Sequence, residues 1–168
     1  EDGWLRTGDI GEVTEEGYLR ITDRKKDLIK TSGGKYVAPQ KLENKLKSMS
    51  TLVSQVLVHG NTRNFCTALV TLNEEEIAKW AEDNGLGGTA MASLAHHKDV
   101  RALIDPLIDT LNADLDRYET IKKDAILDAD FSQEAGDLTP TMKVKRRVVE
   151  AKYKDVLDGF YEGAIQSV

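Results

Sequence analysis

The chain has 168 residues, a formal net charge of −6 and 40% hydrophobic residues, which indicate one globular domain of ordinary size. No apolar run approaches the ~20 residues that a membrane-spanning helix needs. Residues 74–137 carry sixteen acidic side chains against six basic ones, which argues against nucleic-acid binding. The single cysteine, Cys66, excludes an internal disulfide, and its apolar surroundings indicate a buried structural thiol in a reducing cytoplasm.

Residues 3–23 predict a β-hairpin, because apolar side chains flank a turn at residues 15–17. The charged residues 24–27 follow between apolar pairs, so we expect a solvated connection there and not a buried strand. Gly33 and Gly34 then allow a positive φ or a close approach of the backbone to a ligand. From the pattern alone, an ordinary basic hairpin explains this joint equally well.

The middle of the chain predicts a small sheet with helices. Pro39 suits the first turn of a helix that ends near Ser48, and two mostly apolar strands follow at residues 53–59 and 65–72. Asn73 is expected to cap a helix whose acidic first turn suits the helix dipole. That helix should cover residues 74–83, followed by a glycine-rich loop at residues 84–89.

The last part predicts one long helix, a strand and a final helix. An apolar stripe covers about residues 99–116, with a kink or a break expected before Pro106. A strand at residues 121–127 and an exposed loop at residues 131–139 come next. The final helix is defined by Val149, Tyr153, Leu157 and Phe160. The predicted fold class is α+β, a small β-sheet covered by helices.

Three stretches, in this order, resemble the motifs of the adenylate-forming enzymes, the superfamily of acyl-CoA synthetases, luciferases and peptide-synthetase adenylation domains. Residues 3–11 (GWLRTGDIG) are similar to the ribose motif. Residues 23–30 (DRKKDLIK), which precede Gly33 and Gly34, are similar to the hinge motif. Residues 138–147 (LTPTMKVKRR) are similar to the motif of the catalytic lysine. Asp23 and Met142 stand where many members have glycine. With these variants, the chain looks most like a long-chain fatty acyl-CoA ligase.

The resemblance implies a divided chain. Residues 1–25 would be the β-hairpin that ends a large N-terminal domain, and residues 26–168 a mobile C-terminal lid domain. The expected partner is this N-terminal domain, which would carry the phosphate loop and the acyl tunnel. Lys26 falls at the hinge position, where the family turns its lid between two half-reactions. The alternative for Lys26 is an ordinary surface lysine.

Two residues are implied to bind the nucleotide outside the lysine motif. Asp9 would bind the ribose, because a carboxylate can accept hydrogen bonds from two vicinal hydroxyls. The alternative is a turn residue after Gly8. Arg24 would hold ribose and phosphate oxygens through its planar guanidinium, and the alternative is a solvated charge.

The catalytic residue implied is Lys143, which would also bind the nucleotide. When a carboxylate attacks the α-phosphorus of ATP, negative charge grows on the phosphoryl oxygens, and a cation there stabilises it. Lys145, Arg146 and Arg147 would add to the positive field. The alternative is a lysine beside a helix N-terminus, where the dipole disfavours it.

A second set would line the CoA channel in the second arrangement of the lid: Ser32, Gly33, Gly34 and Lys35. Two glycines let the backbone approach a narrow pantetheine chain, and a simple tight turn is an equally good interpretation.

The implied function is that of a C-terminal piece of an ATP-dependent long-chain fatty acid–CoA ligase, inactive alone, which uses ATP, Mg²⁺ and CoA. No metal site is expected within the chain, because the adjacent His96 and His97 lack a third ligand. One alternative passes the acyl group to a carrier-protein thiol or a reductase domain. Another is a non-catalytic nucleotide-binding module. Peripheral membrane association stays open.

Overall fold

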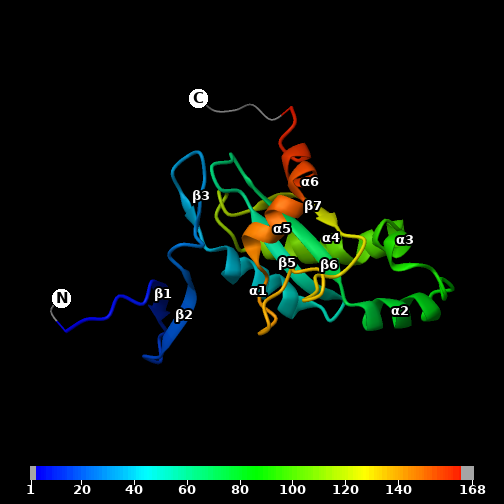
Figure 1. The fold of residues 1–168 in the computed structure, drawn as a ribbon, viewed down its shortest axis with the longest axis horizontal. Coiled ribbons are helices and arrows are strands. Elements are labelled where there is room, and N and C mark those ends of the chain that lie inside the picture. The colour runs from blue at the N-terminus through cyan, green and yellow to red at the C-terminus, as the bar shows by residue number, and fades with distance from the viewer. Residues whose placement is uncertain (1–2, 164–168) are drawn as a thin grey trace.

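The computed structural model describes residues 3–163, which form a β-hairpin beside an α+β body (Figure 1). In chain order the elements are β1 (Asp9–Val13), β2 (Leu19–Arg24), β3 (Ile29–Lys30), β4 (Tyr36–Val37), α1 (Pro39–Met49), β5 (Val53–His59), β6 (Cys66–Leu72), α2 (Glu74–Asp83), α3 (Met91–Ala95), α4 (Lys98–Ala113), β7 (Ile121–Ile126), α5 (Arg146–Lys152) and α6 (Lys154–Gly159). Within the described residues, no helix has the length and apolar character needed to cross a membrane.

The hairpin of β1 and β2 is antiparallel, as the sequence predicts. Most of its apolar side chains, and those just before it, face solvent. Trp4, Leu5 and Tyr18 are exposed by 85%, 86% and 74%, so burial within this chain does not stabilise the hairpin. Such a surface is typical of one that another body covers.

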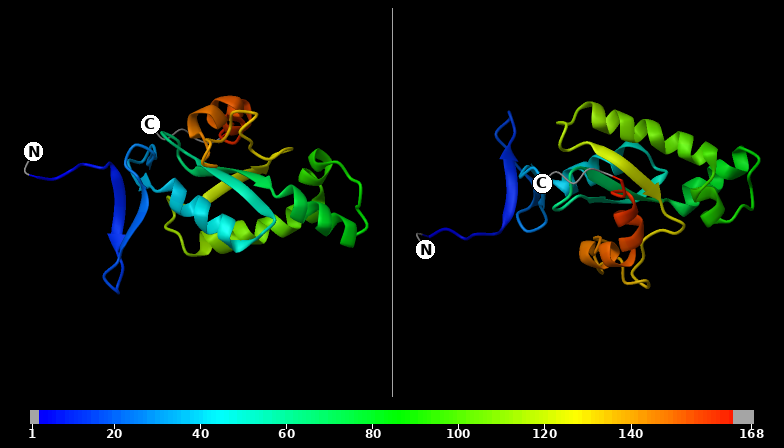
Figure 2. Two further views of the ribbon diagram at one scale, coloured as in Figure 1. Left: turned by 60° about the horizontal axis from the view of Figure 1, so that its bottom comes forward. Right: turned by 90° about the horizontal axis from the view of Figure 1, so that it is seen from above.

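The body is a three-stranded sheet in the order β5-β6-β7, with helices on both faces (Figure 2). β5 and β6 are antiparallel, whereas β6 and β7 are parallel, which the long crossover through α4 permits. Both faces of the central strand β6 are covered, and all seven of its residues are buried. Alternate residues therefore enter two cores: Val70 packs toward α1 and α4, and Leu69 packs toward α5 and α6.

Of the kink or break predicted before Pro106, the break does not occur, because α4 is continuous through this residue. A proline in a helix deprives the carbonyl four residues earlier of its hydrogen bond. That carbonyl belongs to Ala102, and both Ala102 and Pro106 are exposed, so water can hydrate it. The helix also ends earlier than predicted, at Ala113, and the apolar Leu115 and Tyr118 pack on the core from the segment after it.

Three other differences concern short segments. The sequence did not predict α3, a helix of five residues. The predicted final helix is divided at Tyr153 into α5 and α6. The loop at residues 131–139 is not wholly exposed, because Phe131 and Leu138 enter the second core. An exposed loop was expected because acidic and small residues dominate its middle.

Candidate functional site

Asp9 and Arg24 lie opposite each other in the register of the hairpin. Arg24 Nε is 3.3 Å from Asp9 Oδ1, and both side chains are partly exposed. The structure therefore brings together the two residues that were predicted to bind ribose and phosphate. Each of the two side chains has the other as its oppositely charged partner.

Lys26 is exposed in the connection after the hairpin, whereas the nearby Asp23 is only 2% exposed. Asp23 Oδ1 accepts a hydrogen bond from the backbone N–H of Arg24 (2.6 Å), and Oδ2 accepts one from that of Gln40 (3.1 Å). Burial raises the pKa of Asp23, and these N–H groups and the charge of Arg146 oppose that shift. The sequence marked Asp23 only as a departure from glycine and gave no sign of its burial.

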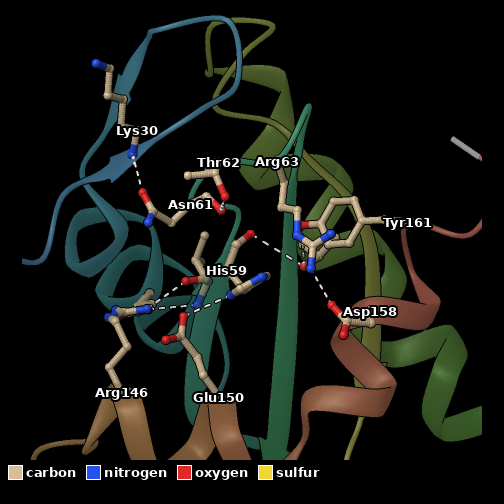
Figure 3. A network of polar contacts seen from close by, with 12 residues as sticks. Lys30, His59, Asn61, Thr62, Arg63, Arg146, Glu150, Asp158 and Tyr161 are labelled. Carbon is tan, nitrogen blue, oxygen red and sulfur yellow. Dashed lines mark hydrogen bonds and ion pairs between the residues drawn. The ribbon is translucent and has the colours of Figure 1, made fainter. Parts of the chain in front are cut away.

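Residues 31–35 form the turn between β3 and β4, which docks on the turn between β5 and β6. Figure 3 shows this contact at Lys30 and Asn61. The backbone N–H of Lys30 donates to Asn61 Oδ1 (3.1 Å), and that of Ser32 donates to the carbonyl of Arg63 (2.8 Å). The backbone of this turn is therefore held by the β5–β6 turn. The β3–β4 turn carries the exposed residues Ser32, Gly33, Gly34 and Lys35.

Residues 139–143 form a compact loop that presents Lys143 to solvent. The backbone of Thr139 and Lys143 closes it, with Thr139 N donating to Lys143 O (2.8 Å). Lys143 N in turn donates to Thr139 Oγ1 (3.0 Å). Met142 has φ +60, in the left-handed region that favours glycine. The backbone of the loop is therefore fixed while the lysine side chain faces outward.

An ion pair and a bridge hold the base of this loop. Leu138 pairs with Val144 in an isolated antiparallel bridge. Asp137 is fully buried and accepts hydrogen bonds from Lys152 of α5 at 2.8 and 3.1 Å. The backbone N–H of Lys145 donates to the carbonyl of Asp137 (2.8 Å). Side chains of α5 thus help to set the position of Lys143.

Arg146 is paired with a carboxylate of the body, and its predicted contribution to a positive field around Lys143 stays a prediction. Its guanidinium donates to Glu43 Oε1 (2.6 Å) and to the carbonyl of Val58 (2.7 Å), and Figure 3 shows it beside His59 and Glu150. Burial raises the pKa of the Glu43 carboxyl, and the charge of Arg146 opposes that shift. Arg146 therefore anchors the start of α5 to the core.

The structure keeps the two candidate loops apart. In Figure 1 the orange segment before α5 lies away from the β3–β4 turn, on the other side of α5. Within residues 3–163, no hydrogen bond or ion pair joins Lys143 to Asp9 or Arg24. The body therefore presents two separate surfaces to any partner.

His96 and His97 have ordinary structural contacts. His96 Nε2 lies 2.7 Å from Asp128 Oδ1, and His97 Nδ1 accepts a hydrogen bond from the N–H of Asp99 at the start of α4. In the part of the chain that the structure describes, no group of three or more potential metal ligands occurs.

Comparison with known proteins agrees with these features. Residues 26–164 match the family described as the AMP-binding enzyme C-terminal domain. Long-chain-fatty-acid–CoA ligase FadD15 of Mycobacterium tuberculosis is 42% identical over 161 residues, which cover 95% of this chain and 27% of the ligase. Long-chain-fatty-acid–CoA ligase ACSBG1 of Rattus norvegicus is 35% identical, over 96% of this chain and 25% of the ligase. The chain thus spans about a quarter of the length of these relatives.

Among solved structures, the fold is similar to the A domain of carboxylic acid reductase from Segniliparus rugosus, solved with AMP and a co-purified carboxylic acid. The TM-score is 0.72 and the identity 28%, over 98% of this chain and 24% of that one. The two identities to ligases are thus higher than this identity to a reductase domain.

Proposed function

Since this chain belongs to the family of AMP-binding enzyme C-terminal domains, we propose that it is the mobile lid domain, with the last hairpin of the preceding domain, of a long-chain fatty acid–CoA ligase. The boundary would fall between residues 25 and 26, which divides the chain into residues 1–25 and residues 26–168. At the outer ends of these two parts, residues 1–2 and 164–168 lie outside the described residues. The observation that supports this function best is Lys143, exposed on a loop with a fixed backbone, in a chain similar to such ligases along nearly its whole length.

In the first half-reaction, a carboxylate oxygen of the fatty acid bonds to the α-phosphorus of ATP. The bond from that phosphorus to the bridging oxygen breaks, and pyrophosphate leaves. Lys143 would stabilise the charge on the phosphoryl oxygens, while Asp9 and Arg24 hold the ribose and the phosphate. Mg²⁺ would arrive with ATP and neutralise phosphate charge, held by groups of the N-terminal domain.

In the second half-reaction, the thiol sulfur of CoA attacks the acyl carbon, its proton is lost, and AMP leaves. A turn of the lid about Lys26 would replace the Lys143 surface with that of residues 32–35 at the active site. The separation of these two surfaces in the structure supports such an exchange. We place the enzyme in the cytoplasm, where its buried free thiol, Cys66, would stay reduced.

The test is Lys143→Ala in the full-length enzyme. Palmitate-dependent release of pyrophosphate from ATP should fall by about 10²- to 10³-fold, the cost of losing one preorganised group of this kind. Conversion of added palmitoyl-AMP and CoA to palmitoyl-CoA should keep its rate. Lys79→Ala is the matched control, an exposed lysine of α2 with no predicted role at the nucleotide, and should change either rate little. Unchanged pyrophosphate release in Lys143→Ala would refute the assignment.

A second candidate function transfers the acyl group to a carrier-protein thiol or a reductase domain. The similarity to adenylation domains of carboxylic acid reductases supports it. Supplying the adenylating enzyme with CoA in one assay and a phosphopantetheinylated carrier protein in another separates the two functions by which thiol becomes acylated.

A further inference from the structure

We propose that Asp23 is a positioning residue that ties the hairpin to the N-terminus of α1, and that this contact controls how readily the lid turns about Lys26. The inference rests on the proposed function, because it takes Lys26 as the hinge. We call the hydrogen bond from Gln40 N to Asp23 Oδ2 the hinge latch.

The first argument is that α1 lacks a cap of its own. Ala38, at its N-cap position, makes no side-chain hydrogen bond, and Pro39 follows with no N–H to donate. The Asp23 carboxylate takes that place from 17 residues earlier in the chain and accepts the N–H of Gln40 (3.1 Å). A carboxylate at a helix N-terminus is favoured by both the free N–H groups and the dipole.

The second argument is the position of the latch in the chain. Asp23 precedes Lys26 and Gln40 follows it, so a large change of φ and ψ at Lys26 must separate donor from acceptor. Asp27 provides the contrast, because Asp27 Oδ2 accepts from Gln40 Nε2 (3.3 Å) and both residues follow Lys26. That pair can move with the lid and stay intact.

The third argument concerns the strength of the latch. Asp23 is 2% exposed, and within the described residues it forms no ion pair, so its charge loses hydration without a direct cationic partner. Its compensation comes from N–H donors and from the field of Arg146, which also belongs to the lid side. When the lid turns, water can solvate both the carboxylate and the Gln40 N–H. Opening the latch therefore exchanges one buried hydrogen bond for hydrogen bonds to water.

The first experiment measures the latch without any activity. Spin labels are attached to Glu15→Cys in the hairpin and Lys79→Cys in α2, both exposed positions, and their separation is measured by pulsed electron paramagnetic resonance. Cys66 stays unlabelled, because burial raises the pKa of its thiol to about 11. Asp23→Ala should raise the population outside the main distance peak by about tenfold, and Asp27→Ala should not.

The second experiment uses the full-length enzyme and its two half-reactions. Asp23→Ala should change the ratio of the pyrophosphate-release rate to the thioester-forming rate by about tenfold, because only one half-reaction uses the latched arrangement. Asp27→Ala should leave that ratio unchanged. If Asp23→Ala fails to fold, Asp23→Asn, which keeps one acceptor oxygen, should give a smaller change in the same direction.

The outcomes separate this inference from the proposed function. An unchanged distance distribution in Asp23→Ala, or an equal fall in both half-reactions, would overturn the hinge latch even if Lys143→Ala behaves as expected. If Asp23→Ala shifts the distance distribution and Lys143→Ala leaves pyrophosphate release unchanged, the hinge latch is supported and the proposed role of Lys143 is rejected.

Discussion

The turn at residues 31–35 and the loop at residues 139–143 have the same backbone scheme at separate places on the body. In each, the N–H of the first threonine donates to the carbonyl of the fifth residue, a lysine, at 2.9 Å in the turn and 2.8 Å in the loop. The lysine N–H donates back to the threonine Oγ1. The fourth residue has a positive φ in both, Gly34 at +76 and Met142 at +60. This scheme is that of a type I turn closed by a left-handed residue.

The difference between them is how each is anchored. The turn is held by backbone hydrogen bonds to the β5–β6 turn, whereas the loop is held at its base by the charged pairs Asp137–Lys152 and Glu43–Arg146. A shared local geometry therefore does not fix where a functional side chain lies. In the loop, the buried side chains around α5 set that position.

The largest effect should come from removing the anchor that only the loop has. Glu43→Ala leaves Arg146 without its buried partner and the N–H of Val58 without an acceptor. We expect the free energy of unfolding, measured with urea, to fall by about 3–5 kcal/mol. Amide exchange at residues 139–143 should quicken more than at residues 31–35. Glu150→Ala, which removes a partly exposed carboxylate, should cost less. Equal costs for Glu43→Ala and Glu150→Ala would contradict the role of the buried Glu43–Arg146 pair as an anchor.

A reciprocal pair of substitutions tests the shared geometry. No atom lies within 4 Å of the position that a Cβ on Gly34 would occupy, so Gly34→Ala should cost only its left-handed conformation, about 1–2 kcal/mol in urea unfolding. Met142→Gly should act in the opposite direction, with a gain of ~0.5 kcal/mol after the entropy that glycine adds to the unfolded chain. A stabilising Gly34→Ala would show that the two turns are not equivalent.

A loss of stability smaller than that of Gly34→Ala concerns the threonines that close each turn. Thr139→Val keeps the shape and removes the acceptor for Lys143 N, which should cost about 1 kcal/mol and slow pyrophosphate release in the full-length enzyme a few-fold. Thr31→Val should cost a similar free energy and leave that rate unchanged, because its turn does not carry Lys143. Comparing the two rates with the two unfolding free energies measures how far the lysine depends on its loop.

Local patterns in the sequence predicted much of this fold. The apolar runs of β5 and β6, the Asn73 cap of α2 and the turn of the hairpin are all confirmed. A stronger signal went unused: residues 14–18, with glycine fourth at Gly17, repeat the scheme of the two turns. The spacing of threonine and glycine could therefore have predicted the geometry of the turn at residues 31–35.

Contacts between distant residues could not be predicted. No pattern near Asp23 predicts that its carboxylate accepts a hydrogen bond from Gln40 N. Arg146 pairs with Glu43, which lies 103 positions away in the sequence. In the sequence both residues look like solvated charges beside other charges, since burial is decided only when the elements pack. Lys143 differs, because its exposure needs no partner and follows from a short polar loop.

The anchoring of α5 by Arg146 also bears on how the protein should respond to heat. A segment attached only at the surface frays before its domain melts, but the 139–143 loop leads within three residues into a helix whose first side chain is joined to the interior. Thermal inactivation of the lysine surface should therefore coincide with cooperative melting of the whole body, without an earlier phase of its own.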